Sequence, residues 1–311
     1  MPYLHEDGPL FRLLVLNCAE KMGMPPAFVV KDYYITMLLK EIAASNPSAC
    51  FKGGTSLSKS HRIINRFSED IDLGMEQEHP TEGQRKKMKF SVCAAVEALG
   101  LEIPNLGETR SKRSFNRFLV PLPKLEQNDP DNTLIVETAL QTPIQPAVEK
   151  EISCFIGDFL EDRGNSEYVS KHDLSPFRMR VSSVERTFVD KVYAICDYYL
   201  EGKTMDRQSR HIYDLFMMLG SVTLDESLLR LFDNVRLQRR GQFMCASAED
   251  GVNLAEIIES ISTSEVYRAD YEDVTLPLLF KSVTYDEASS CLKVISAFLR
   301  QGYTQAIGSQ A

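Results

Sequence analysis

The chain has 311 residues, of which 43% are hydrophobic and 25% charged, and its formal net charge is -9. This composition excludes a disordered chain and leaves room for two domains of ordinary size. The acidic balance argues against indiscriminate binding to nucleic acids or anionic membranes, so a polyanionic substrate would need a local basic patch. The seven scattered cysteines form no CxxC pair, which favours reduced thiols over a disulfide framework or a zinc site. Without a signal-peptide pattern or a long apolar run, the sequence predicts a cytoplasmic protein with no membrane partner.

The first half of the chain mixes predicted helices and strands. Helices are expected over 9–45, interrupted by Gly23 and two prolines, and over 81–100. The run 55–67 also has helical spacing. Short β-rich runs are expected at 49–54, 69–75, 114–122 and 131–140. This mixture predicts an α+β sheet domain.

The second half is predicted to be mostly helical from about residue 175. Ser182 and Glu185 have the spacing of a capping box before one amphipathic helix, and Thr284 and Glu287 have it before another. A further helix is expected over 207–220. We therefore expect a sheet-containing domain at 1–150 and a helical domain at 151–311, joined near 150–178.

The stretch "KGGTSLSKSHRIINRFSEDIDL", residues 52–73, combines a glycine turn with two closely spaced carboxylates. In a strand Asp70 and Asp72 share one face, where their mutual repulsion is relieved if a cation lies between them. Carboxylates of this kind suit Mg²⁺, or Mn²⁺. The paired glycines allow close approach of a ligand, and a helix starting there aims N–H groups at a phosphate. The alternative is a pair of exposed strand or turn acids, but the combination favours phosphoryl chemistry.

Glu137 is a candidate third metal ligand. It lies in "TLIVETAL", where alternation places Leu134, Val136 and Leu140 on one face and Ile135, Glu137 and Ala139 on the other. A charge inside an apolar run is costly unless it has a partner. Two interpretations remain open at this point, a glutamate facing water and a residue that supports the metal.

These motifs resemble the nucleotidyltransferase superfamily with the polymerase-β-like fold, in which a glycine turn precedes an acid-x-acid strand. More narrowly, "FKGGTSLSK" and "RFSEDIDL" are similar to the AbiEii/AbiGii toxin family, which includes the MenT toxins. The stretches "VVKDYYITMLL", "ERTFVDKVYAI" and "RHIYDLF" extend the similarity over most of the chain. The resemblance implies a polymerase-β-like mixed sheet domain followed by a mostly helical domain.

The resemblance also implies roles for individual residues. Asp70 and Asp72 would bind Mg²⁺, and Lys191 and Asp214 would complete the nucleotide site. The turn that would grip the triphosphate has Gly-Gly where many relatives have Gly-Ser, and it consists of Gly53, Gly54, Thr55 and Ser56.

The predicted helices leave two interpretations open for Lys191 and for the polar residues around Asp214. Lys191 lies beside the apolar stripe of its helix, where a lysine either extends its ammonium into water or reaches a phosphate from a partly buried position. One polar sector of the next helix is expected to contain Arg207, Arg210, His211 and Asp214. It is either a solvated face with an Arg210–Asp214 surface ion pair or a lining for the nucleotide or acceptor.

A basic segment is the candidate acceptor site. "RSKRSFNR" contains Lys112, Arg113 and Arg117 with Phe115 among them, and "RKKMK" at 85–89 is a further cluster. Such clusters are often solvated faces, but in an acidic protein they also suit an RNA backbone.

Together these features predict a Mg²⁺-dependent nucleotidyltransferase toxin that uses an NTP and releases pyrophosphate. By resemblance the acceptor would be the 3′ end of tRNA, and the partner a winged-helix antitoxin. Two alternatives remain, an enzyme that nucleotidylates a protein side chain and an NTP-binding or GTP-binding module without transfer activity.

Overall fold

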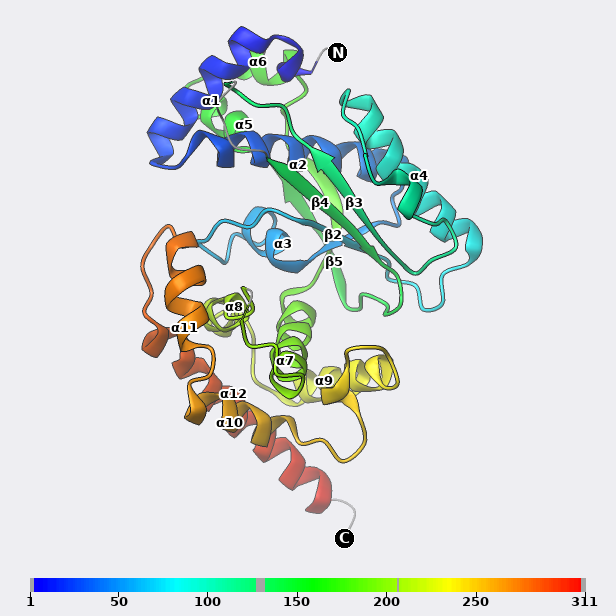
Figure 1. The fold of residues 1–311 in the computed structure, drawn as a ribbon, viewed down its shortest axis with the longest axis vertical. Coiled ribbons are helices and arrows are strands. Elements are labelled where there is room, and N and C mark those ends of the chain that lie inside the picture. Colours follow the sequence, from blue (N-terminus) through cyan, green and yellow to red (C-terminus); the bar gives the residue numbers. More distant parts are fainter. Residues whose placement is uncertain (1–2, 127–131, 206, 309–311) are drawn as a thin grey trace. The chain divides into compact units, whose positions relative to one another are not determined.

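The structure is a computed structural model that describes residues 3–126, 132–205 and 207–308. The described part of the chain forms two compact units, which Figure 1 colours by sequence. The first consists of Met1–His61 and Ser68–Ser182, and the second of Arg62–Phe67 and Ser183–Ala311. The chain therefore leaves the first unit for one short segment and then returns to it.

A mixed sheet is the centre of the first unit. Among the described residues six strands pair in the order β3-β4-β2-β1-β6-β5. β1 runs parallel to β6, and β2 to β4, whereas the pairs β1–β2, β3–β4 and β5–β6 are antiparallel. The predicted α+β class is confirmed. The strands are β1 Cys50–Lys52, β2 Ile71–Gly74, β3 Phe115–Pro121, β4 Thr133–Ala139, β5 Ala147–Ile152 and β6 Phe177–Ser182.

Helices α2 and α4 cover one face of this sheet, and Figure 1 shows them beside its strands. They pack against each other, α2 also against β6 and α4 against β4. The predicted N-terminal helices and the helix over 81–100 are confirmed. The helices of this unit are α1 Gly8–Met22, α2 Pro26–Ser45, α3 Gly53–Lys59, α4 Glu82–Ala98, α5 Phe155–Glu161 and α6 Ser166–Lys171, with short 3-10 turns η1 Leu4–Glu6 and η2 Leu106–Glu108.

Alternation along the strands determines what each face of the sheet carries. Ile71 and Leu73 of β2, and Leu134 and Val136 of β4, are fully buried in the core that includes α2 and α4. The residues between them point to the opposite face, as the sequence predicts. Asp131, the first residue of the predicted strand 131–140, lies outside the described residues.

The second unit is helical. Helix α8 packs against α7 and α12, and α12 also packs against α10. Its elements are α7 Val184–Leu200, α8 Arg210–Leu219, α9 Glu226–Arg239, α10 Leu254–Ser264, α11 Arg268–Asp270 and α12 Tyr285–Gly308, with the 3-10 turns η3 Ala246–Ala248 and η5 Leu276–Leu278 and the π-helical turn η4 Tyr271–Thr275.

The helix caps show how closely the sequence sets these boundaries. The predicted capping box of Thr284 and Glu287 is present, since each backbone N–H donates to the side chain of the other residue. The other box is displaced by one residue, because Ser182 ends β6 and Ser183 caps α7 by accepting from the Arg186 N–H. We expected the domains to divide at 150, but β5 and β6 complete the sheet, and the units divide after Ser182.

The segment Arg62–Phe67 corrects the predicted helix over 55–67. Helix α3 ends at Lys59, and Arg62 has a φ of 55°, which a right-handed helix does not accommodate. The backbone of the segment pairs instead with residues 278–280 of the same unit. The Phe67 N–H donates to the Leu278 carbonyl at 3.0 Å, and the Phe280 N–H donates to the Asn65 carbonyl at 2.9 Å.

Two further findings concern the sequence expectations. All seven cysteines are free thiols. Of the helices that the structure describes, none is by itself long and apolar enough to cross a membrane, and only α1 and α2 taken together, bent by 114°, meet those requirements of length and composition.

Candidate functional site

A row of four charged residues crosses the sheet of the first unit. Lys52 of β1 is in register with Asp72 of β2, Asp72 with Glu137 of β4, and Glu137 with Arg117 of β3. These residues lie on the face opposite the α2 and α4 core. The row therefore places two carboxylates side by side on adjacent strands, with one cation at each end.

The charges and burial around Glu137 shift its pKa in opposing directions. Burial raises the pKa of Glu137, and the negative charges of Asp72 and Asp70 raise it further. Arg117 and Lys52 act in the opposite direction, and the Arg117 Nε lies 3.6 Å from the Glu137 Oε1. A carboxylate crowded by other carboxylates is relieved when a cation is bound among them.

The glycine turn meets this row at Asp72. Gly53 begins α3 with a φ of 78°, and a Cβ placed on it would lie 2.0 Å from the Asp72 Oδ2. Only a residue without a side chain lets the Asp72 carboxylate occupy this position. The glycine turn and the acidic strand, separate in the sequence, are thus adjacent in space.

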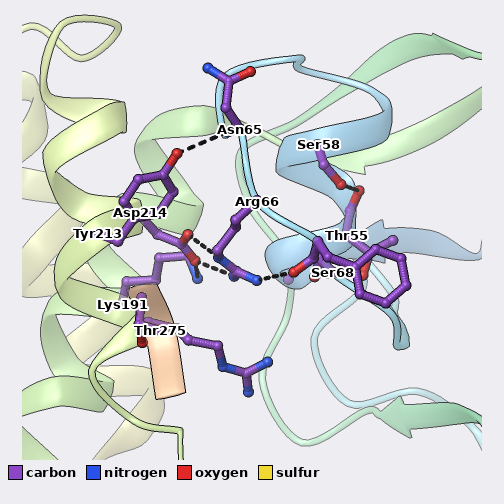
Figure 2. Close-up of polar contacts among 12 residues, drawn as sticks. Thr55, Ser58, Asn65, Arg66, Ser68, Lys191, Tyr213, Asp214 and Thr275 are labelled. Atoms are coloured by element: carbon purple, nitrogen blue, oxygen red, sulfur yellow. Dashed lines mark hydrogen bonds and ion pairs between the residues drawn. The ribbon is translucent and has the colours of Figure 1, made fainter. Parts of the chain in front are cut away.

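The hydroxyls of the turn are buried and make local hydrogen bonds. The Thr55 Oγ1 lies 3.0 Å from the Ser68 Oγ, and the Ser56 Oγ donates to the Gly53 carbonyl at 2.8 Å. Figure 2 draws Thr55 and Ser68. Lys52, the N-cap residue of α3, makes no side-chain cap. The first-turn N–H groups of Gly53 and Gly54 therefore have no side-chain acceptor from the cap residue.

The donor set fits a magnesium ion with few protein ligands. Within the described ranges no group of three or more His, Cys, Asp or Glu side chains is arranged to hold a metal. Asp72 and Glu137 are two carboxylates on paired strands, and Asp70 immediately precedes β2. Mg²⁺ is usually bound by one or two carboxylates, with water and substrate phosphates as the other ligands. The oxygen-only chemistry of this site matches that preference.

A second charged group, formed by Arg66, Lys191 and Asp214, lies inside the second unit. The Arg66 guanidinium donates to both Asp214 carboxylate oxygens at 2.7 Å, and the Lys191 Nζ donates to Oδ2 at 2.6 Å. Figure 2 shows both cations directed at this carboxylate. Asp214 is fully buried, with Arg66 3% and Lys191 6% exposed. This finding excludes a surface ion pair for Asp214 and an ammonium in water for Lys191.

The buried charges shift one another's protonation. Burial alone would raise the pKa of Asp214, but the positive charges of Arg66 and Lys191 hold it well below its usual range. Burial lowers the pKa of Lys191, and Asp214 only partly opposes this. The carboxylate is therefore ionised at neutral pH.

The predicted polar sector of α8 is only partly correct. Arg207 precedes the helix, because its φ of 74° is left-handed and Asp270 accepts hydrogen bonds from the Arg207 and Ser209 N–H groups. Arg210 begins α8, and its Nε donates to the Arg207 carbonyl at 2.9 Å. Asp214 lies on the buried side of α8 rather than on a solvated face.

His211, also in α8, is a neutral imidazole. Burial lowers its pKa well below the usual value, and the charge of Lys191 lowers it further. In the described residues its buried Nδ1 has no hydrogen-bond partner. Its ring stacks on that of Tyr198 with 5.8 Å between the centroids.

The predicted acceptor residues come together at the edge strand β3. Arg113 precedes β3 and Arg117 lies within it, and both line a pocket of about 460 Å³. Lys112 is exposed beside them, with its Nζ 3.4 Å from Glu82.

Sequence reasoning missed Arg66 and Asp270. Arg66 falls within the quoted "RFSEDIDL", but nothing in the sequence pairs it with a residue 148 positions later. Asp270 lies in a stretch without a recognisable motif. The sequence carries no local signal for either residue, because the partners of both lie far away in the chain.

Comparisons with known proteins identify the family and the fold. The model of a family described as the nucleotidyl transferase AbiEii toxin of a type IV toxin–antitoxin system matches residues 38–289. Among solved structures, the chain is similar to MenT4, a nucleotidyltransferase toxin from Mycobacterium tuberculosis H37Rv. The TM-score is 0.56 and the identity 17%, over 93% of this chain and 89% of that one. This likeness confirms the predicted fold. No match was found among curated protein sequences.

Proposed function

Because the chain belongs to the AbiEii family of nucleotidyltransferase toxins from type IV toxin–antitoxin systems, we propose that it transfers a nucleotide to the 3′ end of tRNA with Mg²⁺ as cofactor. The observation that carries this proposal is the in-register pair Asp72 and Glu137 beside the Gly53 turn. It combines a carboxylate site for a divalent cation with the first-turn N–H groups of α3, which have no side-chain acceptor from the cap residue.

The proposed roles follow from these positions. Asp70, Asp72 and Glu137 hold the cation, and the turn Gly53 to Ser56 contacts the triphosphate. Mg²⁺, or Mn²⁺, would neutralise phosphate charge and favour attack at the α-phosphorus. The 3′ hydroxyl oxygen of the acceptor forms a bond to this phosphorus while the bond to the β-phosphate oxygen breaks. Pyrophosphate leaves, and a carboxylate accepts the hydroxyl proton.

Residues of the second unit keep their predicted roles in nucleotide binding. In this proposal Lys191 and Asp214 belong to the nucleotide site, and the bidentate contact from Arg66 holds the Asp214 carboxylate beside the Lys191 ammonium. Arg207, Arg210 and His211 remain predicted nucleotide contacts.

The test is a labelling experiment with the full chain. Wild type and Asp72→Asn are incubated with Mg²⁺, each α-labelled NTP in turn and total tRNA, and RNA and protein are resolved on one gel. We expect label on tRNA, reduced at least about 100-fold in the variant because a main electrostatic stabiliser is lost. Asp162→Asn, a change of the same kind at the exposed C-cap of α5, is the control and should leave transfer unchanged.

The other outcomes define the alternatives. Label on protein that is indifferent to added tRNA would overturn the RNA acceptor and identify side-chain nucleotidylation. Nucleotide binding without any labelled product would leave a binding module. A reaction that persists in EDTA would contradict the requirement for a metal.

The family also implies an antitoxin partner, and we propose that it is a small winged-helix protein encoded nearby. Because the substrates are NTP and tRNA, the proposed site of action is the cytoplasm. Co-expression of this chain with the neighbouring gene should restore growth. A binding measurement on a mixture of the two purified proteins should show whether the restoration requires a complex.

A further inference from the structure

The basic segments that are separate in the sequence form one surface at the edge of the sheet. Within the first unit, the Arg85 Nη1 of α4 donates to the Lys112 carbonyl at 3.5 Å, and the Lys89 Nζ donates to the Thr109 carbonyl at 3.2 Å. These contacts join the cluster at 85–89 to the loop at 109–113. A concentrated basic surface on a chain of net charge -9 indicates a local site for a polyanion.

A pocket opens on this surface beside β3. Its volume is about 460 Å³, and its lining combines the cations Arg113 and Arg117 with the apolar Phe115 and Leu119. Phe115 is 43% exposed, although a phenylalanine is normally buried. An exposed aromatic ring between arginines is the usual composition of a site that stacks a nucleic-acid base and holds its phosphates.

The backbone of the pocket favours a nucleotide over a peptide strand. Edge strands bind peptides through their free N–H and C=O groups. Here the Asn105 side chain occupies that edge, since its Nδ2 donates to the Arg117 carbonyl at 2.9 Å and its Oδ1 accepts from the Leu119 N–H at 3.0 Å. Glu108 in the pocket wall offers an acceptor for an exocyclic base amine.

The pocket is close to the candidate reaction centre within the same unit. Arg117 is both a pocket residue and the end of the charged row that continues through Glu137 to Asp72. Two strand spacings separate β3 from β2, a distance of about 10 Å. A short single-stranded segment of RNA whose 3′ end lies at the Asp72 and Glu137 carboxylates would therefore reach the pocket.

We propose that this pocket binds one unpaired nucleotide of the RNA acceptor near its 3′ end, with the base against Phe115 and the phosphates at Arg113 and Arg117. The inference rests on the proposed RNA acceptor and extends it to a specific subsite. The enzyme would thus require a single-stranded 3′ tail, because a paired base cannot lie flat on Phe115.

The test measures binding separately from transfer. The probe is an RNA hairpin with a single-stranded 3′ tail that contains 2-aminopurine, titrated into the full chain carrying Asp72→Asn. In this background we expect the tail fluorescence to be quenched on binding. Phe115→Ala should abolish the quenching and weaken binding at least about fivefold, as expected when a base loses its aromatic partner.

A second variant keeps the test informative. Arg113→Gln should lower the slope of log affinity against log salt by about 0.7, the value for one phosphate contact on a single strand. The controls are Phe90→Ala, which removes an aromatic ring 70% exposed on α4, and Lys150→Gln, which removes an exposed charge on β5. Both should bind the probe like the parent.

The outcomes separate this inference from the proposed function. If Phe115→Ala retains the quenching and affinity of the parent, the pocket is not the subsite, even when labelled tRNA forms normally. If tRNA receives no label but Phe115→Ala loses the quenching, the subsite stands and the transfer assignment fails. A hairpin with a blunt end that quenches as strongly would overturn the requirement for an unpaired nucleotide.

Discussion

The two charged groups of this protein differ in how well their charges are compensated. In the sheet of the first unit, Asp72 and Glu137 lie side by side on a partly exposed face, where burial and the charge of Asp72 raise the pKa of Glu137. In the second unit, the buried Asp214 has two cations within hydrogen-bond distance. The first group would gain stability by binding a cation, whereas the carboxylate of the second already has its counter-ions.

This difference teaches that a crowded carboxylate pair and a buried ion pair can be distinguished by their charge balance. A crowded pair of carboxylates is retained where it binds something, because by itself it opposes folding. A buried carboxylate with bidentate arginine contacts stabilises the packing around it, and its loss leaves unpaired charge in the interior. Substitutions in the two groups should therefore affect different quantities.

The largest expected effect on stability comes from Arg66→Met. Removing the guanidinium leaves Asp214 with one cation in a buried site, which should lower the free energy of unfolding by about 3–5 kcal/mol. Chemical denaturation of the purified wild type and variant measures this decrease in the free energy of unfolding. Arg178→Met is the matched control, because Arg178 pairs with Glu149 on the surface, and it should change stability by less than about 1 kcal/mol. A small effect of Arg66→Met would contradict the structural role.

The same group should make stability depend on pH. The pKa of Asp214 is held well below its usual range in the folded protein, whereas it is about 3.9 in an unfolded chain. The stabilisation by its charge is therefore complete above about pH 4 and is lost as the pH falls further, through the folded pKa. The difference in unfolding free energy between wild type and Asp214→Asn should be constant near neutral pH and shrink in acid. A difference that grows below about pH 4 would show that the carboxylate is not held ionised.

Gly53→Ala should have a smaller effect on stability, about 1–2 kcal/mol, because alanine is strained at a φ of 78°. Its new Cβ would also displace the Asp72 carboxylate, so transfer activity should fall by more than the stability loss explains. Gly83→Ala in the first turn of α4 is the control, since its Cβ meets only an ordinary contact. Equal transfer activities of Gly53→Ala and Gly83→Ala would show that Gly53 does not position the Asp72 carboxylate for the reaction.

Local patterns predicted only part of the first of these groups, because they left Glu137 open between a glutamate facing water and a residue that supports the metal. The alternation of apolar and acidic residues around Asp72 and Glu137 fixes the face on which each carboxylate lies. The glycine pair predicts a close approach, although only the structure shows that Asp72 is the group that approaches Gly53. The pattern was informative because both carboxylates interrupt buried strands.

The second group could not be predicted in the same way. The residues 55–67 have helical spacing, but their last part pairs with residues 278–280, and this tertiary pairing overrides the local preference. Lys191 and Asp214 were identified through a resemblance, and the helical wheel gave Asp214 the wrong environment because it contains no information about Arg66. Long-range ion pairs are not encoded in the spacing of either partner.

The segment Arg62–Phe67 lies early in the chain but belongs to the second unit, and this has a consequence for synthesis of the protein. Arg66 leaves the ribosome 148 residues before Asp214, an interval on the order of ten seconds at ordinary rates of translation. During that time the Arg66 guanidinium must stay solvated. Residues 278–280, which pair with the backbone of the segment Arg62–Phe67, have not yet been synthesised. The helical unit is therefore finished only near the end of synthesis, and a prematurely terminated chain lacks the partners of its own early segment.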